Sequence, residues 1–310
     1  MANPIEHGRR IAAVDPNYPF GIEEEFFVSS MPGGNTVRRM PADFFAACEA
    51  ALPGVVEPEL LQSQIEVATP PCQSMAEARA ALSRYRRTLG AVAADHGLAI
   101  IAAGTHPTAL WSRQTSTDAA RYDRLMKDLQ MLGARNMVCG LHVHVGLPDP
   151  SRRAGVLTRL IPFLPLFFAL SASSPFWQGR RTGLMAYRLA AYDELPRTGL
   201  PDAFESDADY RRYVDILVAA GAIPDASYIW WATRVSKAHP TLELRIADAC
   251  TRLDDAIALA ALFRALVRRI DRDDSINAGL GAVTRAIAVE NKWRGQRYGV
   301  HGRFIDEARR

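Results

Sequence analysis

Two short segments carry acidic or imidazole side chains at every second position. They are GIEEEFF, with Glu23 and Glu25, and GLHVHVG, with His142 and His144. Successive side chains of a strand point to opposite faces, so each pair shares one face. A lone histidine on an apolar strand is usually a hydrogen-bonded core residue, and an acidic pair usually faces water. Two histidines at this spacing, flanked by glycines, favour a role as metal or phosphate ligands.

Two further segments show the same alternation. Gln62, Gln64 and Glu66 share a face of LQSQIEVA, and Glu243 and Arg245 share a face of TLELRIAD. Taken singly, the first predicts an amphipathic surface strand and the second a surface salt bridge worth about 0–1 kcal/mol. The alternative for the second is a metal-binding carboxylate beside a guanidinium that binds phosphate.

Together these strand faces predict one site for cations and a nucleotide. Mg²⁺ and Mn²⁺ prefer carboxylate oxygens, and Mn²⁺ also accepts imidazole. Beside a nucleotide, such cations orient phosphate for in-line transfer. The chain contains neither G-x-x-x-x-G-K-[ST] nor G-x-G-x-x-G, so the sheet rather than a glycine loop would hold the phosphates. The side chains expected on this concave face are Glu23, Glu25, Glu66, His142, Glu243 and Arg245.

The elements that position these residues predict a mixed α+β fold. Strands and helices follow one another without regular βαβ alternation, which favours a largely antiparallel sheet. Ser74 and Glu77 form a capping box at the start of one helix. No linker interrupts the chain, so residues 1–310 are expected to form a single domain. We expect helices at 74–96, 118–132, 209–220, 254–270 and 278–292, and strands at 20–28, 61–68, 98–103, 138–146, 228–235 and 241–248.

Composition narrows the class of protein. The net charge of +3 over 310 residues is too weak to attract nucleic acid. The start, MANPIEHGRR, lacks the apolar core of a signal peptide, and the apolar stretch 160–172 contains two prolines and is too short to span a bilayer. The four cysteines form no Cys-x-x-Cys pair and are expected to be buried thiols in a reducing compartment. We therefore expect a cytoplasmic protein without a membrane or nucleic-acid partner.

Six segments resemble, in order, the carboxylate–amine ligase family, also called glutamate–cysteine ligase type 2. They are GIEEEF, QSQIEVATP, GTHP, GLHVHVG, LELRIAD and ENKWRGQRYG, and they place the family motifs within residues 20–298. The resemblance implies a glutamine synthetase-like fold, with the active site on a curved antiparallel sheet and helices on the other face. It also implies ATP-dependent formation of a γ-glutamyl-type amide through an acyl phosphate, with Mg²⁺ or Mn²⁺ and weak glutamate–cysteine ligase activity.

The resemblance assigns metal ligands to the strand faces. Glu23 and Glu25 would supply carboxylates to two or more metal sites. Glu66 would join Glu25 at one of them, and His142 and Glu243 would join Glu23 at another.

The same resemblance assigns catalytic and phosphate contacts. Arg245 would contact the transferring phosphate, and His144 would reach the phosphates or the substrate. With Glu66, these two residues form the expected catalytic set.

Basic residues outside the four strands also fall in family-like motifs. In ENKWRGQRYG, Lys292 and Arg294 are candidates for nucleotide binding and Arg297 for substrate binding. In SPFWQGRRTGLMAYR, Arg181 or Arg188 would contact substrate. The ordinary alternative for the first group is a basic helix end that interacts favourably with the helix dipole.

Two other functions stay open at this point. His142 and His144 could hold zinc in a metal-dependent hydrolase, or the chain could be a non-catalytic nucleotide-binding protein. The family resemblance implies small-molecule substrates, an amino-acid carboxylate and an amine, and a homo-oligomer such as a dimer. The chain also looks short after Tyr298 for this family, which we expect to alter substrate access and not the metal-bearing motifs.

Overall fold

A seven-stranded sheet, antiparallel at every pairing, forms the centre of the protein. The computed structural model describes residues 18–307, so the N-terminal segment discussed above lies outside the described residues. The strand order is β2-β3-β1-β5-β9-β8, and β4 also pairs with β1. The strands are β1 Phe20–Ser30, β2 Val56–Pro58, β3 Gln64–Ala68, β4 Leu98–Ile101, β5 Gly140–Gly146, β8 Thr233–Val235 and β9 Thr241–Asp248, while β6 Phe176–Trp177 and β7 Arg180–Arg181 form a separate hairpin.

The long central strand β1 ties the two halves of the sheet together. Its residues 23–27 pair with β3 along one edge. Along the other edge, residues 20–24 pair with β5 and residues 27–30 pair with β4. β1 therefore brings β3 and β5, which are far apart in the sequence, to either side of the same acidic segment.

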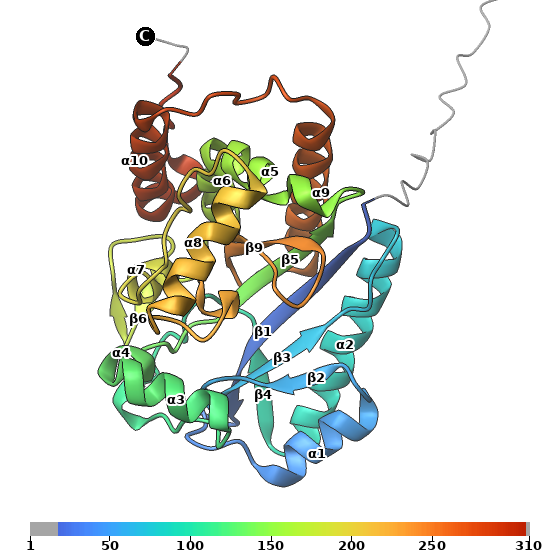
Figure 1. Ribbon diagram of the computed structural model, residues 1–310. Helices are drawn as coiled ribbons and strands as arrows, with labels where there is room; N and C mark the ends of the chain where they lie inside the picture. The colour runs from blue at the N-terminus through green and yellow to red at the C-terminus, as the bar shows by residue number, and fades with distance from the viewer. Residues whose placement is uncertain (1–17, 308–310) are drawn as a thin grey trace, which may run out of the picture.

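Helices cover one face of this sheet. Figure 1 shows α1 and α2 beside the β1, β2 and β3 strands, and α5, α6 and α9 at the end formed by β5 and β9. Contacts between α9 and β5, α6 and β9, and α2 and β4 hold this layer in place. The helices are α1 Ala42–Ala51, α2 Met75–Asp95, α3 Ala120–Leu129, α4 Met131–Ala134, α5 Arg153–Leu160, α6 Leu164–Ser171, α7 Arg188–Tyr192, α8 Asp207–Ala219, α9 Leu253–Arg272 and α10 Ala282–Tyr298.

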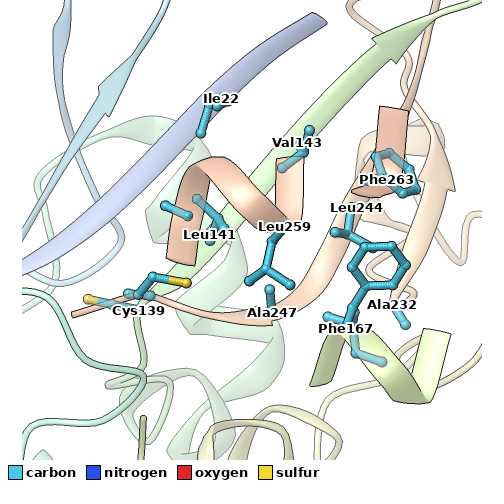
Figure 2. Packing of buried hydrophobic residues seen from close by; sticks show 14 of the residues in the cluster. Ile22, Cys139, Leu141, Val143, Phe167, Ala232, Leu244, Ala247, Leu259 and Phe263 are labelled. Carbon is cyan, nitrogen blue, oxygen red and sulfur yellow. The ribbon is translucent and has the colours of Figure 1, made fainter. Parts of the chain in front are cut away.

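The helix-covered face of the sheet carries the apolar core. In Figure 2, Leu141 and Val143 of β5 lie between Ile22 of β1 and Leu244 of β9, facing Leu259 of α9. All five are buried. Because side chains alternate along a strand, the residues between them point to the opposite face. Burial of this apolar face therefore forces the intervening glutamates and histidines onto the other side.

Glu24 shows how strictly the alternation holds. It lies on the helix side of β1 and is almost fully buried, where its carboxylate accepts hydrogen bonds from Arg86 Nη2 at 2.6 Å and Arg86 Nε at 2.9 Å. A buried carboxylate is tolerated when it is paired in this way. Glu24 is thus a structural residue, whereas its neighbours Glu23 and Glu25 face the other side.

The α+β class and the antiparallel sheet are confirmed, and most predicted elements are present. Helix α2 begins as expected, with the Ser74 hydroxyl accepting a hydrogen bond from the Glu77 amide. All four cysteines are buried thiols, as predicted. The helix expected at 118–132 is instead divided at Gln130, whose φ of 50° interrupts α3 and α4. Gln62 does not extend β3, because it lies in a turn and its backbone amide donates to the carbonyl of Thr115 in a neighbouring loop.

The apolar stretch around α6 is longer than the sequence predicted. The chain remains helical through Pro162 and Pro165, so Pro150–Ser171 reaches 22 residues and would be long and apolar enough to cross a membrane. In this protein, 61% of its apolar window is buried. That burial is typical of a core helix.

Candidate active site

Four neighbouring strands bring the predicted acidic and imidazole side chains to the open face of the sheet. The pairing places Glu25 opposite Glu66 and Glu23 opposite His142. Opposing residues in antiparallel strands have their Cβ atoms about 4.5–5.5 Å apart, which is close enough for direct contact. The juxtaposition predicted from alternation is therefore present in the structure.

The first cluster consists of Glu25, Glu59 and Glu66. One carboxylate oxygen from each lies within 4.8 Å of the others. Glu59 follows β2, where Glu57 is opposite Glu66 in the ladder. Glu59 was not among the residues expected from the sequence, although Glu57 and Glu59 stand two positions apart, as Glu23 and Glu25 do. Three carboxylates this close repel one another when ionised, unless a proton or a cation offsets their charge.

Glu23 is shared by two further clusters. It meets Glu66 and His142 in one and His144 and Glu243 in the other, with ligand atoms within 4.8 Å in each. Its carboxylate lies 3.2 Å from His142 Nδ1 and 3.0 Å from His144 Nε2. Glu23 therefore occupies the centre of the site.

The resemblance had placed His142 beside Glu243, and the clusters correct this detail. His144 is directly opposite Glu243, whereas the register between β5 and β9 shifts between Leu141 and Val143. This β-bulge leaves His142 without a direct partner in β9 and directs it toward Glu23 and Glu66. The alternation pattern of the sequence does not reveal a bulge. For this reason His142, and not His144, was expected beside Glu243.

Repulsion and burial raise the pKa values of the acids in the first cluster. Burial raises the pKa of Glu66 well above its usual range, and the charges of Glu59 and Glu23 raise it further. Burial likewise raises the pKa of Glu25, with a further contribution from Glu59. A divalent cation bound here would lower the pKa values of these carboxyl groups by stabilising their ionised form.

The central glutamate behaves in the opposite way. Burial disfavours the charged form of Glu23, but hydrogen bonds from His142 and His144 outweigh it and hold the pKa of this carboxyl well below its usual range. Burial opposes protonation of His144, yet its hydrogen bond to Glu23 and the charge of Glu243 raise its pKa. His142 Nε2 is buried without a hydrogen-bond partner. An orphaned imidazole nitrogen beside carboxylates suits a metal ion.

Two arginines flank Glu243 on the deeper side of the site. Arg234 Nε and Nη2 donate to its two carboxylate oxygens at 2.7 and 3.0 Å, and Arg245 forms an ion pair with it. Burial would raise the pKa of Glu243, but Arg245 and Arg234 hold it well below the usual range. The sequence predicted Arg245 and missed Arg234, which stands opposite Glu243 on β8.

Most of these residues line a cavity of about 500 Å³. One part of its wall is acidic, another carries arginines, and a third is apolar. His144 and Glu243 do not line the cavity. They lie behind two residues that do, because His144 contacts Glu23 and Glu243 contacts Arg245. The lining includes Glu23, Glu25, Glu57, Glu59, Glu66, His142, Arg121, Arg188, Arg234, Arg245, Leu60, Leu125, Leu129, Leu195 and Trp230.

A known protein family covers almost the whole chain. The model of glutamate-cysteine ligase family 2 matches residues 19–310, which includes every strand and helix described above. The chain belongs to this family. The family assigned from six short motifs is thereby confirmed over nearly the full length of the chain.

Relatives within glutamate–cysteine ligase family 2 include proteins from several bacteria. A protein of Bradyrhizobium sp. (strain ORS 278) is 51% identical over 290 residues, which cover 94% of this chain and 71% of that protein. A protein of Pseudomonas aeruginosa is 44% identical, with 94% of this chain and 76% of that protein covered. Both carry the provisional name glutamate–cysteine ligase 2.

Two solved structures share the fold at low sequence identity. A bifunctional glutathione synthetase from Pasteurella multocida gives a TM-score of 0.68 at 15% identity, covering 91% of this chain and 42% of that one. A glutamate–cysteine ligase from Francisella tularensis, solved in complex with AMP, gives 0.56 at 13% identity, covering 90% and 82%. The glutamine synthetase-like class expected from the family resemblance is consistent with this shared fold.

Of the two arginines singled out in the segment SPFWQGRRTGLMAYR, Arg188 reaches the cavity. It is buried on α7, and its Nη1 donates to the carbonyl of Arg245 at 3.0 Å. A Cβ at Gly140 would overlap Arg188 Nη2, so the glycine makes room for the guanidinium. Arg181, in contrast, is exposed on the hairpin strand β7 and does not line the cavity.

The basic residues of the last motif also lie away from the cavity. Lys292 pairs with Asp193, Arg294 pairs with Glu290 one helical turn away, and Arg297 stacks on Tyr298. None of the three lines the cavity. Their predicted contacts with nucleotide or substrate gain no support from this arrangement.

The ion pair of Lys292 gives this motif a structural role near the site. Asp193 directly follows α7, which carries Arg188 into the cavity. At the other end of the same segment, the carbonyl of Gln296 accepts hydrogen bonds from the amides of Met185 and Ala186. Helix α10 thus holds the α7 segment at two points.

We expect Lys292→Met to destabilise the protein by about 2 kcal/mol, because it leaves the largely buried Asp193 carboxylate without its partner. The double variant with Asp193→Asn should recover part of that loss, since no unpaired charge then remains. Urea unfolding of the three proteins measures both effects. Unchanged stability with a raised KM for ATP would instead show that Lys292 contacts the nucleotide.

Proposed function

We propose that this member of glutamate–cysteine ligase family 2 is an ATP-dependent carboxylate–amine ligase that forms an amide through an acyl phosphate. The observation that supports this most is the set of three carboxylate and imidazole clusters around Glu23, on the open face of the sheet. Family membership supports ligation. The Francisella tularensis ligase that shares the fold was solved in complex with AMP, which supports an adenine nucleotide as the phosphate donor.

The chemistry requires activation because a free carboxylate has no adequate leaving group. A carboxylate oxygen of the first substrate attacks the γ-phosphorus of ATP, and the bond to ADP breaks. The amine nitrogen of the second substrate then attacks the acyl carbon, and inorganic phosphate departs with the electrons of the acyl C–O bond. The ammonium gives up its proton, and the products are an amide, ADP and phosphate.

The donor set fits Mg²⁺ or Mn²⁺. Each of the three clusters is dominated by carboxylate oxygens, and burial raises the pKa values of Glu25 and Glu66. Hard divalent cations prefer such oxygens, and Mn²⁺ accepts an imidazole as well. When bound, they would neutralise phosphate charge. The residues that would hold them are Glu23, Glu25, Glu59, Glu66, His142, His144 and Glu243.

The arginines would act on the transferred phosphoryl group. Arg245 lines the cavity, and its Nε is buried without a hydrogen-bond partner. Glu243 orients its guanidinium from behind, as Tyr192 does by accepting from Nη2 at 3.2 Å. A donor preorganised in this way stabilises developing negative charge without having to reorient during the reaction. The apolar wall would limit hydrolysis of the acyl phosphate by excluding water.

The zinc hydrolase considered earlier gains little from the geometry. Among the described residues, no cluster holds both His142 and His144, and each imidazole shares its cluster with two carboxylates. We propose a single catalytic domain acting on small molecules. The cytoplasmic location and the homo-oligomeric state stay predictions from the sequence.

A direct assay tests the proposed activity. We expect the purified protein to release ADP from ATP with Mg²⁺ or Mn²⁺ only when both a carboxylate and an amine are present, with glutamate and cysteine among the pairs tried. The product should contain a new amide bond by mass spectrometry. ADP release that ignores the amine, or no release with any pair, would contradict the ligase.

A further inference from the structure

The phosphoryl chemistry gives the apolar part of the cavity wall no contact with a substrate. We propose that Arg121, Leu125, Leu129 and Trp230 form the amine subsite and select an α-amino acid with an apolar or aromatic side chain. This inference rests on the proposed ligase function and adds the chemical class of the acceptor.

The apolar surface continues outward from the cavity. Leu125, Leu129 and Trp230 line both the cavity and an adjoining groove of about 660 Å³, whose other lining includes the apolar Ile223 and Pro224 and the charged Asp128 and Arg197. A leucine or phenylalanine side chain would remain on apolar surface from the cavity into this groove. Glycine or cysteine would leave most of that surface in contact with water. Each methylene group that a substrate buries in an apolar pocket raises selectivity for that substrate by about tenfold.

Aromatic rings and guanidinium groups alternate beside this surface. The guanidinium carbon of Arg121 lies 5.8 Å from the ring centroid of Tyr228, and that of Arg197 lies 5.4 Å from the ring centroid of Trp230. The ring centroids of Tyr228 and Trp230 are 5.7 Å apart. Arg197 is held in place because its Nε donates to the carbonyl of Tyr228 at 2.9 Å. The rings therefore have a fixed arrangement against which a second apolar group can pack.

Arg121 supplies the charge that an amino acid requires. Within residues 18–307 no carboxylate forms an ion pair with it, although it lines the cavity. A guanidinium in this position suits the α-carboxylate of the acceptor, which it can bind through two hydrogen bonds. Asn136 also lines the cavity, and its Oδ1 is buried without a hydrogen-bond partner. This oxygen can accept a hydrogen bond from the amine of the acceptor.

The same wall suits a nucleotide base less well. Adenine carries no charge to pair with Arg121. It usually also needs free backbone groups, but the amides of Trp230 and Ala232 already donate to the carbonyls of Arg197 and Gly199. The amino-acid acceptor satisfies both the cation and the apolar surface.

The test compares acceptors and variants in the ADP-release assay. The acceptors are leucine, phenylalanine, glycine, cysteine and phenethylamine, which is phenylalanine without its carboxylate. We expect kcat/KM for leucine or phenylalanine to exceed that for glycine and cysteine at least about 10-fold. Arg121→Gln should raise the KM for the preferred amino acid about 10-fold or more, leave the KM for ATP unchanged, and have no effect with phenethylamine.

Two controls separate the possible outcomes. Arg124→Gln changes an exposed arginine of the same helix that does not line the cavity, and should behave as the wild type. Leu129→Asn should reduce the preference for the apolar amino acid without changing the KM for ATP. A raised KM for ATP in either cavity variant, or turnover best with glycine or cysteine, would overturn the subsite alone. No ADP release with any acceptor would reject both the ligase and its subsite.

Discussion

Glu23→Gln is expected to lower amide-forming turnover by about 100- to 1,000-fold while the protein stays folded. Glu23 contributes to two of the three donor clusters and contacts both His142 and His144. Glutamine keeps the shape of the side chain but removes its charge, so both clusters lose a carboxylate at once. The loss should persist at saturating Mg²⁺ and ATP, because it affects charge stabilisation during phosphoryl transfer as well as binding.

Glu49→Gln is the matched control for this substitution. Glu49 is an exposed glutamate on α1, and its replacement should leave turnover unchanged. Thermal unfolding of both variants shows whether each is folded at the assay temperature. Turnover by the Glu23 variant within about threefold of the wild type would mean that the clusters do not carry the reaction.

Mg²⁺ is expected to stabilise the protein at alkaline pH and to have little effect in acid. The pKa values of Glu66 and Glu25 are raised in the folded protein above the usual value of 4.5, mainly by burial. Their contribution to stability is therefore fully present below about pH 4.5 and is lost as pH rises through the raised values. The metal-free protein should become less stable over that range, because the carboxylates ionise against one another.

A bound cation reverses this trend, since it interacts with the ionised carboxylates. At about 100 times its dissociation constant, a ligand specific for the folded state adds about 2.7 kcal/mol. For a chain of 310 residues, that corresponds to a rise in Tm of about 4 °C. Differential scanning fluorimetry near pH 8 and near pH 5, with and without Mg²⁺, measures the difference. NaCl at matched ionic strength controls for screening.

An equal Mg²⁺ effect at both pH values would contradict this prediction, as would a larger effect in acid. Glu66→Gln provides an independent check. It removes one of the repelling charges, so the metal-free variant should be more stable than the wild type near pH 8 and should gain less from Mg²⁺.

Side-chain alternation was enough to predict which residues share the open face of the sheet. An apolar set such as Leu141 and Val143 must face the helices, and this determines where His142 and His144 point. The same rule placed Glu24 on the helix side, where it pairs with Arg86. The local period of two thus determines the face of each residue without knowledge of the rest of the fold.

Pairings between distant segments could not be predicted in the same way. The bulge in β9, opposite His142, decides which histidine meets Glu243, and it depends on the register between strands about a hundred positions apart. Lys292 was expected at the nucleotide because of its motif, but its partner Asp193 lies 99 positions away. Such contacts are set by tertiary packing, which no local pattern encodes.

The most direct measurement is a crystal structure with Mn²⁺ and a non-hydrolysable ATP analogue, in which anomalous scattering locates the metal. We predict Mn²⁺ among Glu25, Glu59 and Glu66 and among Glu23, His144 and Glu243, with the phosphates of the nucleotide beside Glu23. Anomalous peaks elsewhere, or a nucleotide bound with its phosphates away from Glu23, would contradict this prediction.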